Sequence, residues 1–128
     1  MGYMFYGTAY EVRDVDIGEL NWDISSVKTA NQMFYEFGCS DTLIKLGTLT
    51  IGNDANYNGL MRLCANINIS INVKNYINQC TDIFFYAAMK AGTMIKLIPL
   101  NEDAMIWCNE MISKYGVNGT SGNGNITI

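Results

Sequence analysis

The sequence repeats one short pattern, in which an apolar cluster that ends in glycine is followed by a segment of alternating apolar and polar residues. The clusters end at Gly7, Gly38, Gly92 and Gly116. An apolar turn closed by glycine is typical of a short helix with a left-handed C-cap. Alternation with a period of two is typical of a half-buried β-strand. Units of roughly 20–30 residues cannot each bury a core, so they must pack on one another.

Five segments carry the strand pattern. The clearest is NINISINV, in which Ile67, Ile69, Ile71 and Val73 all fall on one face. Pro99 indicates that its strand has a free edge at that point, because proline cannot donate a ladder hydrogen bond. The predicted strands are residues 12–20, 42–52, 66–73, 94–100 and 125–128.

Read together, these units predict an α/β fold: a short leucine-rich-repeat-like solenoid with parallel strands on one side and short helices on the other. The 128 residues are expected to form a single repeat domain, residues 1–128, of about five helix–strand units. An ordinary small α/β sheet of unknown strand order is the alternative, because the spacing of the units is uneven.

Composition argues against several functions. The net charge is −4 and the chain has no basic run that could neutralise phosphates, so no nucleic-acid partner is expected. It has no histidine, the usual general base and activator of nucleophiles, so we expect neither an enzyme nor a cofactor. No apolar stretch reaches the ~20 residues of a membrane span. The four cysteines lack C-x-x-C spacing and are expected to pack as small hydrophobes, with a disulfide as the alternative.

The stretch DANYNG gives a weak indication of a calcium site. Asp54, Asn56, Asn58 and Gly59 match the first half of an EF-hand loop. The twelfth position is Ala65, where that loop needs a bidentate glutamate. The favoured interpretation is therefore a turn built by Asx hydrogen bonds, and no metal site is predicted.

Residues 22–35, WDISSVKTANQMFY, resemble the repeat of the BspA-like leucine-rich-repeat surface proteins. The opening MGYMFYG, residues 1–7, matches the second half of the same repeat. Beyond residue 52 only the rhythm of the units continues. Consecutive Met33, Phe34 and Tyr35 are expected to be core residues, two facing the strands and the third covering the next turn. The matching residues of the longer stretch are Trp22, Asp23, Ser25, Val27, Met33, Phe34 and Tyr35.

The resemblance implies a non-enzymatic recognition or adhesion module that binds protein or glycan, on a bacterial surface or in a phage tail. It implies an extracellular or virion location, although no signal peptide is visible, so a cytoplasmic location stays open. The open ends of a solenoid are expected to dock on further repeats, another subunit or a second copy. The candidate contact residues are the polar members of the strands, Asp14, Asp16, Lys45, Thr48, Asn68, Ser70 and Lys96.

Two functions from other classes remain as alternatives. One is a structural subunit that assembles through its exposed edges and has no ligand. The other is a carboxylate-based hydrolase, which would need Asp14 or Asp16 to face a second acid across a cleft. An exposed acidic strand face is the simpler interpretation of these two residues.

Overall fold

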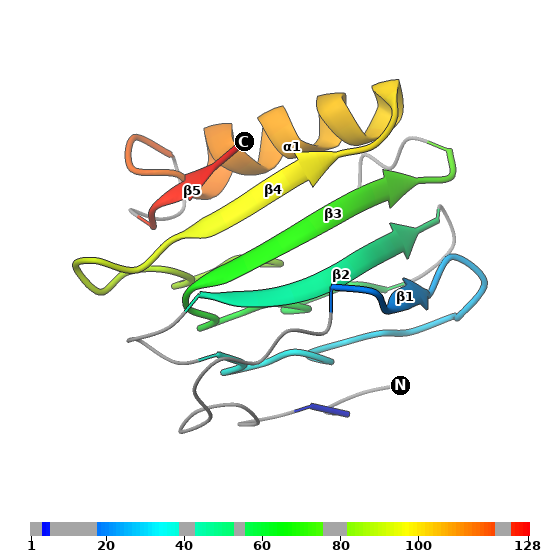
Figure 1. Cartoon of the computed structure of the whole chain (residues 1–128), viewed down its shortest axis with the longest axis horizontal. Coiled ribbons are helices and arrows are strands. Elements are labelled where there is room, and N and C mark those ends of the chain that lie inside the picture. The colour runs from blue at the N-terminus through cyan, green and yellow to red at the C-terminus, as the bar shows by residue number, and fades with distance from the viewer. Residues whose placement is uncertain (1–3, 6–17, 39–42, 53–55, 76–81, 120–123) are drawn as a thin grey trace.

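The computed structural model describes residues 4–5, 18–38, 43–52, 56–75, 82–119 and 124–128. All its strands form one parallel sheet, in which they lie in the same order as in the chain (Figure 1). The fold is therefore α/β with a parallel sheet, as predicted. The elements are β1 Asn21–Asp23, β2 Ile44–Ile51, β3 Ile67–Val73, β4 Ile95–Pro99, α1 Glu102–Tyr115 and β5 Ile126–Thr127.

Four predicted strands are confirmed as β2, β3, β4 and β5. All four apolar residues of β3 are buried, as its alternation predicts. The free edge at Pro99 is also confirmed in the described part of the chain. Pro99 pairs with Ile71 of β3 on one side, whereas on the other side β5 pairs only with Ile95 and Lys96 of β4. The first prediction is wrong at its end: Gly18 and Glu19 form a turn, Leu20 is not part of a strand, and β1 begins at Asn21. Residues 12–17 lie outside the described part.

The short helices predicted before Gly38 and Gly92 are wrong, because those residues form successive turns. In the first of them, Gln32 and Glu36 have positive φ angles of 54°, which an α-helix does not tolerate. Isolated helices this short are also unfavourable because nucleation is costly. The backbone instead donates to a neighbouring segment, with Phe34 N 2.8 Å from Leu60 O.

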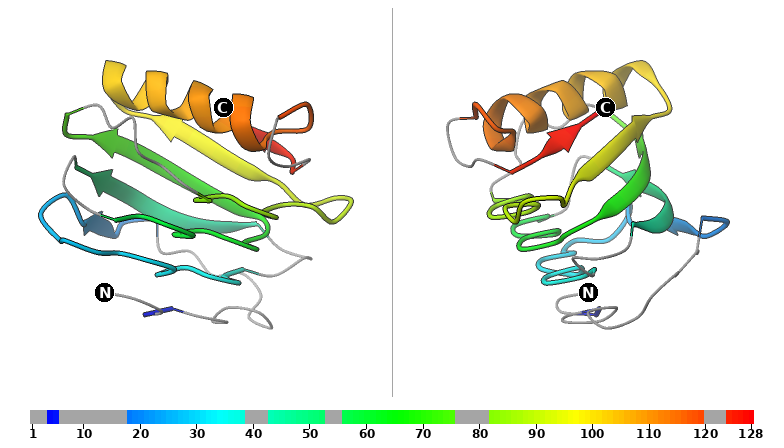
Figure 2. Two further views of the ribbon diagram at one scale, coloured as in Figure 1. Left: turned by 180° about the vertical axis from the view of Figure 1, so that it is seen from behind. Right: turned by 60° about the vertical axis from the view of Figure 1, so that its left-hand side comes forward.

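Three such turn segments, residues 30–37, 57–64 and 82–88, form a layer facing the sheet (Figure 2). They are hydrogen-bonded in register, since Phe34 N donates to Leu60 O and Met61 N donates to Ile83 O. Phe5 N donates to Met33 O of the first segment. On the outside of this layer the Arg62 guanidinium lies over Tyr35 and Phe85, 6.0 and 5.1 Å from their ring centroids. The second segment was not predicted, because it lacks the Met-Phe-Tyr sequence.

The core lies between the sheet and the turn segments. Met33 and Phe34 are fully buried and Tyr35 is half-buried, as predicted for this run of residues. Helix α1 is the only helix in the described part of the chain and contains the predicted apolar cluster that ends at Gly116. The predicted left-handed C-cap is wrong there, because Gly116 has a φ of −66° and an extended backbone. Helix α1 covers the core beside the third turn segment. There the ring centroid of Phe84 lies 6.0 Å from that of Trp107 and 6.3 Å from that of Tyr115.

Candidate functional site

The face of the sheet that points away from the turn segments is polar; we call it the outward face. In β3 the residues Asn68, Ser70 and Asn72 alternate with buried apolar residues and lie on this face. Parallel pairing places all three beside a residue of β2, and places Asn68 and Ser70 beside a residue of β4 as well. Three rows result, which are Lys45–Asn68–Lys96, Asn21–Thr48–Ser70–Ile98, and Asp23–Thr50–Asn72.

The first two rows contain a hollow of about 190 Å³. The register of β2 shifts between Lys45 and Gly47, and the extra residue, Leu46, is buried. Gly47 has a φ of 88°, a backbone conformation that favours glycine, and presents no side chain to the hollow. The residues that line the hollow are Gly18, Lys45, Gly47, Asn68, Ser70 and Ile98.

The bulge is held from the neighbouring strand. The indole Nε1 of Trp22 in β1 donates to the carbonyl of Leu46 at 2.6 Å. The Trp22 ring also packs edge-on against Phe5 and Phe34. Trp22 therefore connects the apolar core to the backbone beside the hollow, which fixes the position of Lys45.

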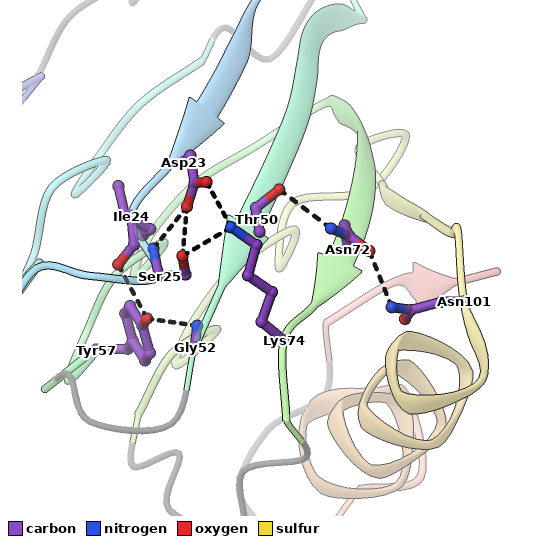
Figure 3. Close-up of polar contacts among 9 residues, drawn as sticks. All are labelled: Asp23, Ile24, Ser25, Thr50, Gly52, Tyr57, Asn72, Lys74 and Asn101. Carbon is purple, nitrogen blue, oxygen red and sulfur yellow. Dashed lines mark hydrogen bonds and ion pairs between the residues drawn. The ribbon is translucent and has the colours of Figure 1, made fainter.

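An ion pair crosses the sheet at the third row, from Asp23 in β1 to Lys74, which directly follows β3 (Figure 3). Lys74 Nζ lies 2.7 Å from Asp23 Oδ2 and 3.3 Å from Ser25 Oγ. Ser25 also donates to Asp23 Oδ1 through its hydroxyl and its backbone N–H, at 2.5 and 3.0 Å. Hydrogen bonds from Lys74 and then Ser25 lower the pKa of Asp23 to about 2. Asp23 is therefore a charged partner of Lys74 and not an acid poised for proton transfer.

A second polar chain joins the sheet to α1 (Figure 3). Asn72 Nδ2 donates to Thr50 Oγ1 at 3.4 Å, and Asn101 Nδ2 donates to Asn72 Oδ1 at 2.9 Å. Asn101 also donates to Val73 O at 2.9 Å and accepts from Ala104 N at 2.8 Å, so it is the N-cap of α1. These bonds hold the side chain of Asn72, the last residue of the third row, between Thr50 and Asn101.

Beneath this face the buried Tyr57 connects the backbone just after β1 to the backbone just after β2. Its hydroxyl accepts from Gly52 N at 2.9 Å and donates to Ile24 O at 3.2 Å (Figure 3). The ring is almost fully buried, so the phenol satisfies backbone groups that water cannot reach.

Five of the predicted contact residues lie together in the first two rows, Lys45, Thr48, Asn68, Ser70 and Lys96. The other two, Asp14 and Asp16, lie outside the described residues. Sequence analysis did not single out Thr50 and Asn72, although both continue the same alternation. It also missed Asn101, whose signal was an asparagine followed by two acids, and Lys74, for which there was no signal.

The calcium candidate is described only in part, because Asp54 lies outside the described residues. Asn56 Oδ1 accepts the N–H of Asn58 at 2.9 Å, which is the Asx turn that the sequence favours. Among the described residues no group of three or more Cys, Asp or Glu could hold a metal ion.

The cysteines that the structure describes do not take part in the site. Cys64 and Cys108 are buried and free, as small core residues are expected to be. Burial raises the pKa of both thiols, that of Cys108 to about 12. Cys39 and Cys80 lie outside the described residues.

No described helix is long and apolar enough to cross a membrane. Comparison of the chain with protein-family models, curated proteins and solved structures finds no match. The resemblance to the BspA-like repeats therefore stays a prediction.

Proposed function

We propose that the chain is a non-enzymatic recognition module, a short solenoid that binds a glycan or a protein on its outward face. The solenoid is supported by the sequential order of the parallel strands and by the turn segments bonded in register. It is further supported by the left-handed residues, which recur at corresponding places: Gln32, Gly59 and Asp82, and four residues later Glu36, Leu63 and Tyr86.

The observation that carries the function is the alignment of polar side chains in rows across hydrogen-bonded strands. A ligand that meets these rows finds donors and acceptors on a backbone that is already fixed, so binding orders little of the protein. The hollow in the first two rows gives such a ligand a concave place to bind.

The charges on this face argue for binding and against hydrolysis. Asp23 is the only acid in the three rows, and it is paired with Lys74. A carboxylate-based hydrolase needs two carboxyl groups that face each other across the substrate. The described part of the outward face offers no such pair in its rows. The BspA-like resemblance adds an extracellular or virion surface as the proposed location.

The same face suits a glycan better than a protein. The centres of protein interfaces are enriched in aromatic and other apolar side chains. In the three rows Ile98 is the only apolar residue, and its exposed fraction is 36%. Amide, hydroxyl and ammonium groups dominate instead, and these match the hydroxyl groups of a sugar.

The test is binding of the purified chain to a glycan array and to a panel of purified extracellular proteins. Ser70→Tyr would fill the hollow and is expected to abolish binding. The matched control is Asn109→Tyr, an equally large change on the exposed side of α1. Both variants should keep the far-UV circular dichroism of the parent. Binding that survives Ser70→Tyr, or no binding to any probe, would refute the proposal.

A second candidate, assembly without a ligand, has one observation in its favour. Leu100, Met105 and Ile106 are apolar, and their exposed fractions are 53%, 43% and 49%. They lie at or near the N-terminal turn of α1, and exposed apolar groups can mark a contact surface. Analytical ultracentrifugation of the chain and of the Met105→Lys, Ile106→Lys variant tests this: an oligomer that the variant dissociates would support assembly.

A further inference from the structure

We propose that two copies of this chain associate through the outside of their turn segments, with Glu36 of each copy meeting Arg62 of the other. We call the side of the three turn segments that points away from the sheet the turn face. It lies opposite the outward face, so this inference goes beyond the proposed function (Figure 2).

Two columns of side chains cross the turn face. The segments are aligned, because Glu36 N donates to Arg62 O at 2.9 Å and Leu63 N donates to Phe85 O at 3.0 Å. The left-handed residues at the end of each segment form one column, and the residues just before them form the other. All six are at least partly exposed, whereas the residues that flank each pair are buried. The columns are Glu36, Leu63 and Tyr86, and Tyr35, Arg62 and Phe85.

The turn face has the composition of a protein interface. Tyr86 and Met89 have exposed fractions of 48% and 46%. The rings of Phe85 and Tyr86 pack together with their centroids 4.0 Å apart, and the guanidinium of Arg62 lies over both Tyr35 and Phe85. Aromatic residues, methionine and arginine are enriched at the centres of protein interfaces, and tyrosine and arginine are frequent among the residues that dominate binding. The turn face therefore suits a protein partner, which the outward face does not.

The charges of the turn face fit a second copy of the same chain. Glu36 and Arg62 lie on neighbouring segments, yet no ion pair joins them, and neither forms one with another described residue. The Nε of Arg62 is also buried without a hydrogen-bond partner. In a symmetric pair each contact occurs twice, so both acids meet a cation and both cations meet an acid. A different partner would have to bring an acid and a base to the same small area.

The association requires little ordering of either copy. Hydrogen bonds between the segments already fix the backbone, and two rings already hold the guanidinium of Arg62. A carboxylate can accept two parallel hydrogen bonds from a guanidinium, which makes such a contact specific in orientation as well as in charge. The two outward faces then point away from each other, so the pair would bridge two separate ligands.

Sedimentation equilibrium of the full chain over a wide range of concentrations tests this inference. The parent chain should show a monomer–dimer equilibrium. Glu36→Arg and Arg62→Glu should each raise the Kd of the dimer about a hundredfold or more, because like charges then meet twice in a symmetric pair. An equimolar mixture of these two variants should restore the dimer, because every charge then meets its opposite on the other chain.

Matched controls reverse the same charges elsewhere. Glu110→Arg on α1 and Lys96→Glu on the outward face change exposed residues and should leave the Kd unchanged. Tyr86→Asn removes an exposed ring, and asparagine tolerates the φ of 56° at this position. It should raise the Kd about tenfold, the scale of an important interface residue. Glu36→Arg and Tyr86→Asn leave the stacked guanidinium in place, so they test the contact even if Arg62→Glu does not fold.

Three outcomes overturn this inference. One is a parent chain that stays monomeric at every concentration, and another is a dimer that Glu36→Arg and Tyr86→Asn leave intact. The third is an oligomer that only the Met105→Lys, Ile106→Lys variant dissociates, which would place the contact near α1 instead. Glycan binding by the outward face is measured separately, so failure of either proposal leaves the other in place.

Discussion

Tyr57→Phe removes one buried oxygen atom and leaves the aromatic ring in place, so it tests the polar link between the ends of β1 and β2 without creating a large cavity. The hydroxyl accepts from Gly52 N and donates to Ile24 O, 33 residues away in sequence. Ile24 O keeps a second donor, Val27 N, at 3.3 Å. Among the described residues Gly52 N has no other partner, so it would be left buried and unpaired in the variant.

The expected cost follows from these contacts. An unsatisfied buried donor costs about 1–3 kcal/mol, and the second lost bond adds about 0.5 kcal/mol because its acceptor stays satisfied. Tyr57→Phe should therefore lower the free energy of unfolding by about 2–3 kcal/mol. Urea denaturation with linear extrapolation measures this change. The control Tyr86→Phe removes an exposed hydroxyl, and should change the free energy by less than about 0.5 kcal/mol.

A second measurement locates the effect. The Gly52 amide should exchange slowly with deuterium in the parent chain and faster in the Tyr57→Phe variant. If Tyr57→Phe unfolds within about 0.5 kcal/mol of the parent, Gly52 N has found another partner. The phenol would then not be the group that links the ends of β1 and β2.

Three further predictions concern stability. Asn101→Ala should cost about 1–2 kcal/mol in urea denaturation because α1 loses its cap, whereas Asn101→Asp keeps the acceptor and should cost less. The pKa of Asp23 is lowered from 3.8 to about 2, so its stabilisation is present above pH 4 and is lost as the pH falls toward 2. With both side chains more than half exposed it should amount to less than about 1 kcal/mol, and Asp23→Asn should remove this part of the pH profile. Gly52→Ala places a Cβ 2.4 Å from Ser25 O and should lower Tm strongly. In the control Gly92→Ala the Cβ meets no atom within 4 Å, and the positive φ costs about 1 kcal/mol, so Tm should fall far less. Equal shifts in Tm would contradict this packing.

The strands could be predicted because their alternation survives in the sequence. In β3 each isoleucine that faces the core is separated from the next by Asn68 or Ser70, and no other structure has this period. The turn segments could not be predicted in the same way. A short apolar run such as Met33-Phe34-Tyr35 does not distinguish a helix from a turn, and the left-handed Gln32 and Glu36 are not glycines.

The candidate site was predictable as a set of residues but not as an arrangement. Alternation indicated that Lys45, Asn68 and Lys96 face outward. Their alignment in one row depends on the register of three strands, and β2 contains a bulge directly after Lys45, of which the isolated Gly47 is the signal in the sequence. Lys74 joins Asp23 across 51 residues, a contact that no local pattern can indicate.

The in-register bonds of the turn segments also indicate where the chain tolerates a change of length. From each strand to its turn segment the spacing is nearly constant: 12 residues separate Trp22 from Phe34 and Leu49 from Met61, and 13 separate Ile71 from Phe84. The spacing from a turn segment to the next strand varies: 15 residues separate Phe34 from Leu49, but only 10 separate Met61 from Ile71.

Phe84 of the third turn segment and Pro99, the partner of Ile71 in β4, are again separated by 15 residues. Loops that already vary in length while the core stays aligned are the natural positions for grafted peptides. Insertions between Ala88 and Ile95 should therefore preserve the fold, whereas equal insertions between Ile51 and Tyr57 should separate the Tyr57 hydroxyl from Gly52.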